Sequence, residues 1–378
     1  MAEQIKVPCT IMRGGTSKAV FLMENHVPTD PDERDRFLLK IFGSPDKRQI
    51  DGLGGADLLT SKCAIIGPST REDADIDYTF AQIGIAVPTV SYEIVCGNIS
   101  AAVGGYAIEQ GLVRAVEPET IVKVHNTNTG KILRVIVPIV NGQPRVVGDF
   151  AIDGVPGTGA EVKLDYSGTS GGATGRLLPT SRVRDTLHVP SLGKDIEVSI
   201  VDVGTVSVFI KAEDLGMTGI EMPDTYTDEH NKVLEEVRKV ASDLCELPPD
   251  NTMTPFPIFV SPPTSYKTHA GDRTINVDEI DLVARMVVTA TGMHKAFPGG
   301  GSICISIAAQ IEGTVVHECS SNKTSPRDVK VGHPSGVISI YGDVVRQDDG
   351  WKVNEVHFSR TARRVLDGYV YLVDGSWK

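Results

Sequence analysis

Lys62 is the first side chain in the sequence whose setting favours acid–base chemistry. It opens an apolar run, 63–66, and it follows a glycine-rich stretch. A lysine at the mouth of a buried strand lies partly out of water, which favours the neutral amine and makes it usable as a base. For a lysine taken alone, a solvated side chain beside a loop is the commoner alternative.

Cys96 is the second such side chain, because it lies where a predicted strand ends and a predicted helix begins. A thiol at a helix N-terminus meets the positive end of the helix dipole and unpaired N–H groups, and both favour the thiolate. The N–H groups of Gly97 and Asn98 could hold a carboxylate or an enolate oxygen. A small buried cysteine is the alternative, but the neighbouring glycine and asparagine favour function.

Two glycine-rich turns in the first half are candidates for binding an anion. The turn at 13–18 lies between two apolar strands, and its N–H groups and hydroxyls could surround a carboxylate. A plain hairpin turn is equally consistent with its composition. The candidate substrate-binding residues in these turns are Thr16, Ser17, Lys18 and Gly55.

An equivalent anion site is expected in the second half. The run 299–311 opens with three glycines and a serine and echoes the run 97–112. Cys304 is predicted to pack against a wall of the core. The turn at 332–336 has polar side chains that could bind a carboxylate, although an ordinary turn would look the same. The candidate binding residues here are Gly300, Gly301, Ser302, His333 and Ser335.

Short strands rich in Val and Ile, punctuated by Gly and Pro, dominate the predicted elements in both halves. One of these predicted strands lies at 313–316. Helices are predicted at 31–42, 227–245, 277–291 and 360–366. The last of these is short and basic, and its arginines are expected at a solvated helix end.

The run 97–112 is the most informative predicted element. It is small and apolar with no charge before Glu109, which suits a helix buried on all sides, such as one inside a curled sheet. Its echo at 299–311 indicates a duplication. The sequence therefore predicts an α+β protein of two similar domains, 1–183 and 184–367. Each is a curled, mostly antiparallel sheet around a central helix, and a last strand near 368–378 crosses back to the first domain.

Composition and charge exclude several classes of function. The formal net charge is −12, which argues against nucleic acid or an anionic membrane as a partner. No apolar run approaches the ~20 residues of a transmembrane helix, and the first residues lack the layout of a signal peptide. Six scattered cysteines without metal-binding spacing indicate a cytoplasmic protein with reduced thiols and no metal.

No cofactor motif is present. The glycines at 171–175 do not follow a strand with a crossover helix, so a dinucleotide-binding fold is a poor match. The sequence also lacks the Gly-x-Ser-x-Gly elbow and the His-Glu-x-x-His pattern. The expectation is a protein that works without a cofactor.

Motifs along nearly the whole chain resemble one known family. It contains 2-methylaconitate cis–trans isomerase, 3-methylitaconate delta-isomerase and 4-oxalomesaconate tautomerase. The matching stretches are 12–18 (MRGGTSK), 51–66 (DGLGGADLLTSKCAII), 96–113 (CGNISAAVGGYAIEQGLV), 125–131 (HNTNTGK), 153–158 (DGVPGT), 177–180 (LLPT), 294–298 (HKAFP), 332–336 (GHPSG) and 360–364 (RTARR).

The resemblance implies a diaminopimelate epimerase-like fold with the active site in the cleft between the two domains. It also implies catalysis without a cofactor, with Lys62 and Cys96 as the catalytic pair and Ser17 in an anion-binding loop. One departure concerns specificity: family members usually carry Asn-Pro where this chain has Gly204-Thr205.

The reaction implied is the migration of a C=C bond by 1,3-allylic proton transfer in a small unsaturated di- or tricarboxylate. Lys62 is the expected main base, and Cys96 is the partner acid/base or steadies the intermediate. Two alternatives stay open: a racemase or epimerase of the same fold, and a non-catalytic polycarboxylate-binding protein. The enzyme is expected to be a homo-oligomer.

Overall fold

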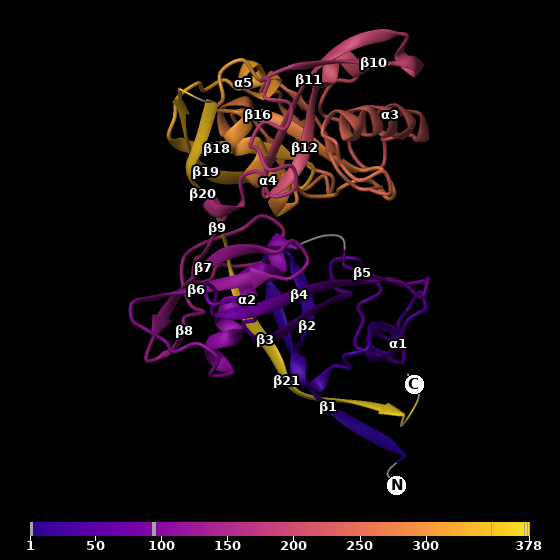
Figure 1. The fold of residues 1–378 in the computed structure, drawn as a ribbon, viewed down its shortest axis with the longest axis vertical. Coiled ribbons are helices and arrows are strands. Elements are labelled where there is room, and N and C mark those ends of the chain that lie inside the picture. The colour runs from indigo at the N-terminus through magenta and orange to yellow at the C-terminus, as the bar shows by residue number, and fades with distance from the viewer. Residues whose placement is uncertain (1–2, 93–95, 349, 374, 376, 378) are drawn as a thin grey trace. The chain divides into compact units, whose positions relative to one another are not determined.

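The computed structural model describes residues 3–92, 96–348, 350–373, 375 and 377. By their contacts they fall into two compact units. Unit 1 comprises Met1–Leu164 and Ser359–Lys378, and unit 2 comprises Asp165–Phe358 (Figure 1). The domain ranges expected from the sequence differ from these units mainly in the placement of residues 165–183, and as folding domains those ranges stay a prediction.

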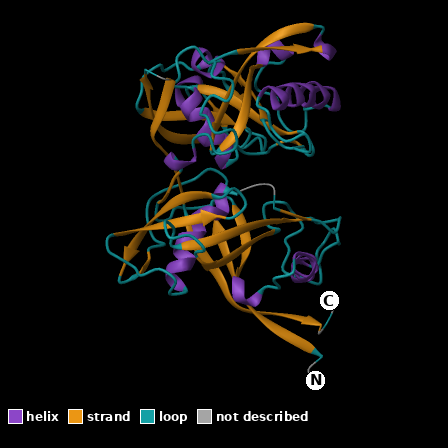
Figure 2. Cartoon of the chain, in the orientation of Figure 1, coloured by secondary structure: helices purple, strands orange, loops and turns teal. Residues whose placement is uncertain are grey.

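Unit 1 is mostly strand, with two α-helices among its described residues (Figure 2). Its strands are β1 (Gln4–Gly14), β2 (Ser17–Met23), β3 (Lys62–Pro68), β4 (Ile76–Ile83), β5 (Val90–Ser91), β6 (Glu119–Asn126), β7 (Lys131–Val140), β8 (Gln143–Pro144), β9 (Val162–Asp165) and β21 (Ala362–Val373). Its helices are η1 (Glu24–His26), α1 (Pro31–Phe42) and α2 (Gly97–Glu109).

The strands of unit 1 pair in a fixed order. β1 and β2 form an antiparallel hairpin, β2 and β3 are parallel, β3 and β4 are antiparallel, β4 and β6 are parallel, and β6 and β7 are antiparallel. α1 connects the first parallel pair, and α2 lies in the connection of the second. β21 returns from the far end of the chain to pair antiparallel with β1.

Unit 2 contains the remaining elements. Its strands are β10 (Asp185–Val189), β11 (Lys194–Val203), β12 (Thr205–Lys211), β13 (Phe256–Ser261), β14 (Tyr266–Lys267), β15 (Thr274–Ile275), β16 (Leu282–Val288), β17 (Gly292–Met293), β18 (Arg327–His333), β19 (Gly336–Gln347) and β20 (Gly350–Arg360). Its helices are η2 (Ser167–Thr169), η3 (Pro190–Leu192), η4 (Ala212–Leu215), α3 (Asp228–Leu244), η5 (Val277–Glu279), α4 (Gly299–Ala308) and α5 (Val315–Cys319).

Unit 2 repeats the pairing order of unit 1. β11–β12 is antiparallel, β12–β13 parallel, β13–β16 antiparallel, β16–β18 parallel and β18–β19 antiparallel. α3 and α4 lie in the two parallel connections, as α1 and α2 do in unit 1. β10 pairs with β11 as β21 pairs with β1. The expected α+β duplication around two central helices is confirmed.

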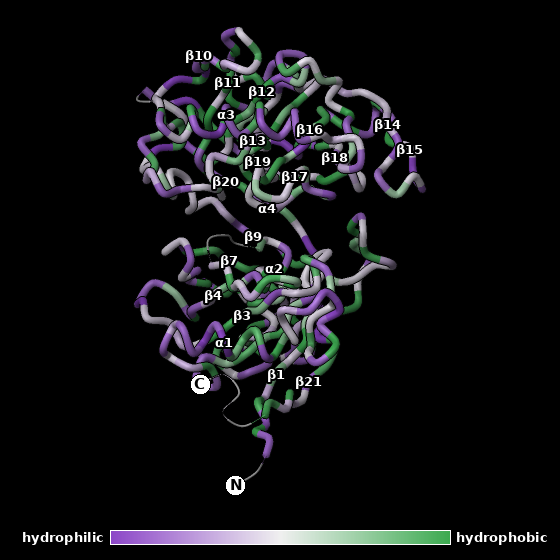
Figure 3. Tube along the Cα trace, turned by 90° about the vertical axis from the view of Figure 1, so that its right-hand side faces the viewer, coloured by the Kyte–Doolittle hydropathy of each residue, from purple (hydrophilic) through white to green (hydrophobic). Residues whose placement is uncertain are grey.

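The central helices are buried because they carry small and apolar side chains on every face. In α2, residues such as Ile99 and Val103 are fully buried. A Cβ at Gly104 would lie 2.8 Å from Val137 Cγ2, so the missing side chain lets the helix approach β7 closely. The apolar residues follow the strands and α2 in Figure 3.

The opposite face of each sheet carries an amphipathic helix, α1 in unit 1 and α3 in unit 2. In unit 1, Phe37 and Ile41 of α1 pack with Val20 and Leu22 of β2. α1 begins at Pro31 because Asp30 accepts a hydrogen bond from Glu33 N, and it ends before Gly43 at φ 71°. The helices predicted at 31–42 and 227–245 are α1 and α3, and both are confirmed to within one residue.

Three other predicted elements are wrong. The helix predicted at 277–291 is a 3-10 turn followed by β16, because its run of Val, Ala, Met and Leu is buried on both faces of the sheet. The basic helix predicted at 360–366 is the end of β20 and the start of β21. The strand predicted at 313–316 overlaps α5, whose first turn is capped by Thr314 accepting from His317 N at 3.0 Å.

None of the helices in the described part of the chain is long and apolar enough to cross a membrane.

Candidate active site

Lys62 and Ser17 lie on the face of the unit 1 sheet that α2 covers. Ala19 is the partner of Lys62 in the parallel register of β2 and β3. Because side chains alternate along a strand, Ser17, Ala19 and Phe21 share one face. The ring of Phe21 lies 5.1 Å from that of Tyr106 in α2, which identifies this face.

The β1–β2 hairpin turn presses against the N-terminus of α2. A Cβ at Gly14 would lie 2.3 Å from Asn98 O, and one at Gly15 would lie 2.1 Å from Asn98 Oδ1. Asn98 Nδ2 donates to Thr16 Oγ1 at 3.0 Å. The β1–β2 turn and the N-terminus of α2 are therefore in direct contact, through residues 82 positions apart in the chain.

Ser17 is buried, yet its hydroxyl has no hydrogen-bond partner among the described residues. A buried hydroxyl without a partner is destabilising by about 1–3 kcal/mol. The hydroxyl of Ser17 is thus a polar group without a partner among the described residues. Its expected contact with substrate stays a prediction.

Lys62 is only 6% exposed, and its side-chain contacts with the described residues are uncharged. Its Nζ donates to Gln82 Oε1 at 2.6 Å and lies 5.3 Å from the centre of the Phe80 ring. Within the described part of the chain no carboxylate forms an ion pair with it. A buried amine in such surroundings is suited to exchange a proton with a ligand.

Cys96 occupies the N-cap position of α2, and residues 93–95 before it lie outside the described part. Its side chain makes no capping hydrogen bond, which leaves the N–H groups of Gly97 and Asn98 for a ligand. Of the six cysteines, all of them described, Cys96 alone is not buried. Burial raises the pKa of the Cys304 thiol to about 12.

Two of the predicted binding residues, Lys18 and Gly55, have contacts that hold the loop at 51–62 in place. The backbone N–H of Lys18 donates to Leu59 O at 2.9 Å, which ties the start of β2 to this loop. A Cβ at Gly55 would lie 2.2 Å from Thr60 Oγ1, so the loop needs a glycine there for packing. Their expected contact with substrate stays a prediction.

In unit 2 the N-terminus of α4 packs against the β11–β12 turn in the same way. A Cβ at Gly300 would lie 3.1 Å from Thr205 Cγ2, and one at Gly301 would lie 2.6 Å from Met286 Sδ. Ser302 Oγ donates to Pro298 O at 2.9 Å, so its hydrogen is used within the helix. The structure thus places the atypical Gly204-Thr205 turn beside Gly300.

The turn at 332–336 is fastened to the segment that leads into α4. Ser335 Oγ donates to Lys295 O, and the His333 ring stacks on Phe297 with centroids 6.4 Å apart. Tyr266 secures the turn by donating to His333 O at 2.8 Å. The predicted binding residues of unit 2 therefore lie on adjoining segments.

Lys62 and Cys96, the predicted acid–base residues of unit 1, have no counterparts of the same type in unit 2. In unit 1, Ala19 of β2 is the register partner of Lys62. In unit 2, Ser207 holds the same position in β12, and its register partner is Phe256. Phe256 is therefore the structural counterpart of Lys62. The N-cap of α4 is Pro298, where that of α2 is Cys96.

Cys304, the nearest thiol to the α4 N-terminus in the sequence, is fully buried and donates to Val201 O at 3.2 Å. Its expected role in packing is in keeping with this contact. A pair of opposed cysteines, one at the start of each central helix, is therefore excluded in this chain.

Two further residues at the site were not among the predicted binding residues, although Arg360 was considered as a partner for a carboxylate. Gln82 meets Lys62 only through the β3–β4 register. Arg360, expected at a solvated helix end, is buried and donates from Nε to Asn98 Oδ1 at 3.0 Å. Because β21 returns to β1 from the other end of the chain, no local pattern indicates this second contact.

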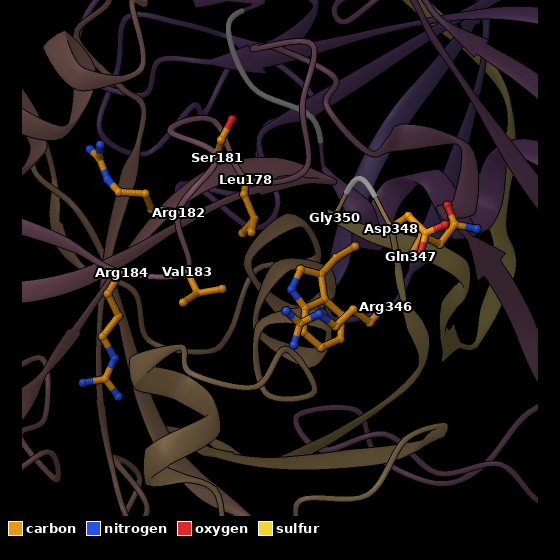
Figure 4. Close-up of a pocket in the computed structure, with 10 residues that line it drawn as sticks. Leu178, Ser181, Arg182, Val183, Arg184, Arg346, Gln347, Asp348 and Gly350 are labelled. Carbon is orange, nitrogen blue, oxygen red and sulfur yellow. The ribbon is translucent and has the colours of Figure 1, made fainter.

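A cavity of about 640 Å³ in unit 2 contains none of the predicted site residues (Figure 4). It is lined by Leu178, Ser181, Arg182, Val183, Arg184, Arg346, Gln347, Asp348, Gly350 and Trp351. Arg182 pairs with Asp185, and Arg184 with Glu197 and Glu318. Two of its three arginines are thus already neutralised, and the cavity is no candidate for the active site.

Replacing Gly15 by alanine is expected to weaken both the fold and substrate binding. Its φ of +52° and the position of Asn98 Oδ1 leave no space for a Cβ. The unfolding free energy should fall by about 1–3 kcal/mol, and KM should rise because Asn98 and Thr16 are displaced. Thermal denaturation and steady-state kinetics measure the two effects.

Gly111→Ala is the matched control, since Gly111 has φ +73° but nothing within 4 Å of a Cβ. It should lose stability with an unchanged KM. A Gly15→Ala protein whose KM equals that of the control would contradict the role of this turn in binding.

The comparisons with known proteins agree with this geometry. A model of the PrpF protein family matches residues 4–373. The chain is 46% identical to 3-methylitaconate isomerase of Eubacterium barkeri, over 98% of each chain. It is 36% identical to 4-oxalomesaconate tautomerase of Pseudomonas putida, over 99% of this chain and 98% of the relative.

Solved structures show the same fold. A methylitaconate-delta-isomerase crystal structure is 43% identical, with a TM-score of 0.85 over 100% of this chain and 98% of that chain. A hydroxyproline epimerase from Agrobacterium vitis, 12% identical, has a TM-score of 0.56 over 98% of this chain and 94% of that chain, a likeness of fold alone.

The fold and these relatives make the chain an isomerase with the diaminopimelate epimerase-like fold. The chain belongs to the PrpF protein family, which its resemblance to methylaconitate and methylitaconate isomerases predicted.

Proposed function

We propose that the protein moves a C=C bond in a small unsaturated di- or tricarboxylate by 1,3-allylic proton transfer. The observation that carries this is the buried amine of Lys62 on the sheet face that α2 covers, where its contacts with the described residues are uncharged. The unpartnered hydroxyl of Ser17 and the open N-terminus of α2 supply binding groups for a carboxylate. The names of the relatives, which act on methylitaconate and oxalomesaconate, support this substrate class.

The proposed reaction needs one proton removed and one returned. The Lys62 amine takes a proton from the allylic carbon, and the C–H electrons form a dienolate that extends onto the substrate carboxylate. The N–H groups of Gly97 and Asn98 stabilise the negative charge that develops there. Return of a proton at the far end of the dienolate completes the shift of the double bond. The Cys96 thiol, or Lys62 itself as ammonium, donates that proton.

The structure disfavours a two-cysteine racemase. Such an enzyme needs a thiol on each side of its substrate, and in this chain Pro298 and Phe256 stand at the counterparts of Cys96 and Lys62. An asymmetric pair, one amine and one thiol from a single unit, is suited to removing and returning a proton at two carbons of one planar dienolate.

A screen of unsaturated acids in D2O tests the proposal. Methylitaconate, methylaconitate, aconitate and oxalomesaconate are each incubated with the enzyme and followed by ultraviolet absorbance and proton NMR. We expect double-bond migration in at least one, with deuterium at the carbon that receives the proton. Ligand-induced thermal stabilisation by these acids without turnover or exchange would instead indicate a binding protein.

We also expect the protein to work without a cofactor, in the cytoplasm and as a homo-oligomer. The reaction as written requires no cofactor. Six scattered cysteines, with no disulfide-scaffold spacing, support a cytoplasmic location. We expect a homo-oligomer, which light scattering of the purified protein measures.

A further inference from the structure

Gln82 faces Lys62 from the neighbouring strand, and both its amide oxygen and its amide nitrogen have hydrogen-bond partners. It is the antiparallel partner of Lys62 in the β3–β4 pair, and its Oε1 accepts from Lys62 Nζ at 2.6 Å. Its Nε2 donates to Ser61 O at 2.9 Å and to Leu58 O at 3.3 Å. Both amide hydrogens are thus used on the loop that precedes Lys62.

These contacts fix which end of the amide meets Lys62. A flipped Gln82 would set its oxygen against the carbonyl oxygens of Leu58 and Ser61 and lose both donor bonds. In the observed orientation the oxygen can only accept, so it orients Lys62 through one N–H and adds no charge beside the amine. A carboxylate in the same place would instead hold the amine as ammonium.

We propose that Gln82 is a positioning residue for Lys62: it fixes the direction of the amine while adding no charge. This inference rests on the proposed function, in which Lys62 is the base. Gln82 thus orients the amine and occupies a position from which a carboxylate side chain would hold the amine as ammonium.

Three variants test the proposal. Gln82→Met keeps the length of the side chain and removes the acceptor. Gln82→Glu keeps the acceptor, adds a charge and loses both donor bonds. Gln49→Met is the matched control, because buried Gln49 holds the same loop through Ala56 N at 2.8 Å and Ser61 Oγ at 2.7 Å without a contact to Lys62.

For Gln82→Met we expect kcat to fall about fivefold, the effect of losing one hydrogen bond of ~1 kcal/mol, with KM nearly unchanged. For Gln82→Glu we expect a larger loss of kcat at neutral pH. Gln49→Met should lower the melting temperature and leave kcat close to that of the wild type. If Gln82→Met changed kcat no more than Gln49→Met, Gln82 would be structural only.

A second readout does not depend on the substrate. Acetic anhydride acylates an amine only in its neutral form. Peptide mapping by mass spectrometry measures the rate of acylation at Lys62. Gln82→Glu should slow this rate by about tenfold or more, since a neighbouring carboxylate favours the ammonium form, whereas Gln49→Met should not. An unchanged rate in folded Gln82→Glu would overturn the inference. Lack of turnover by the wild type, with the acylation result intact, would overturn only the proposed function.

Discussion

Lys62→Met should lose nearly all turnover while keeping the fold, and Lys62→Ala should do the same. General base catalysis contributes about 10²–10⁴-fold to a rate, and no other described amine shares the position of Lys62 at the start of β3. Methionine approximates the volume of the buried stem, so the sheet and its contact with Phe80 are preserved. Steady-state kinetics on the acid identified by the screen gives kcat.

Two controls separate chemistry from folding. Near-ultraviolet circular dichroism and the melting temperature should match those of the wild type. Lys62→Arg keeps a cation there but provides no usable base, so it should be as inactive as Lys62→Met. A Lys62→Ala or Lys62→Met enzyme with the wild-type rate would refute the assignment of the base.

Iodoacetamide should inactivate the enzyme by labelling Cys96 first. The other five cysteines are buried, and burial raises the pKa of the thiol of Cys319 to about 11 and that of Cys245 to about 12. Cys96 occupies the N-cap of α2 and is only partly buried, so the reagent can reach its thiol. Peptide mapping identifies the labelled residue, and a substrate carboxylate should protect it.

Cys96→Ser should be strongly impaired, by about 10²-fold or more, because a hydroxyl is a far weaker acid than a thiol at neutral pH. Cys319→Ser is the matched control, since Cys319 lies in α5 of unit 2. Labelling of another cysteine with equal loss of activity would count against Cys96. Full activity of Cys96→Ser would restrict the chemistry to Lys62 alone.

Transfer of deuterium from substrate to product, measured in the wild type and in Cys96→Ser, distinguishes a one-base from a two-base route. If Lys62 both removes and returns the proton, Cys96→Ser should still transfer part of the label from deuterated substrate to product. If Cys96 is the acid, label transfer should be absent in the wild type. Either result preserves the base assigned to Lys62.

How much of the site the sequence predicted depends on whether its signal was local. The start of α2 was placed correctly at Gly97, because an apolar run without charge and an opening glycine mark a buried helix N-terminus. The contacts of Asn98 with Thr16 and Arg360 were not predicted, since each joins residues that are distant in sequence. The wrong assignment of 277–291 has a related cause: a strand buried on both faces has no alternation that distinguishes it from a helix.

By itself the sequence determined the fold class, the duplication, the family and the identities of the proton-transfer candidates, because small-residue helices, glycine turns and family motifs are local in the chain. Only the tertiary structure decided that Lys62 meets an uncharged partner in Gln82, that Ser17 is buried without one, and that unit 2 has Phe256 and Pro298 at the corresponding positions. Strand register and helix packing set those contacts, and both depend on pairings between segments that no local pattern encodes.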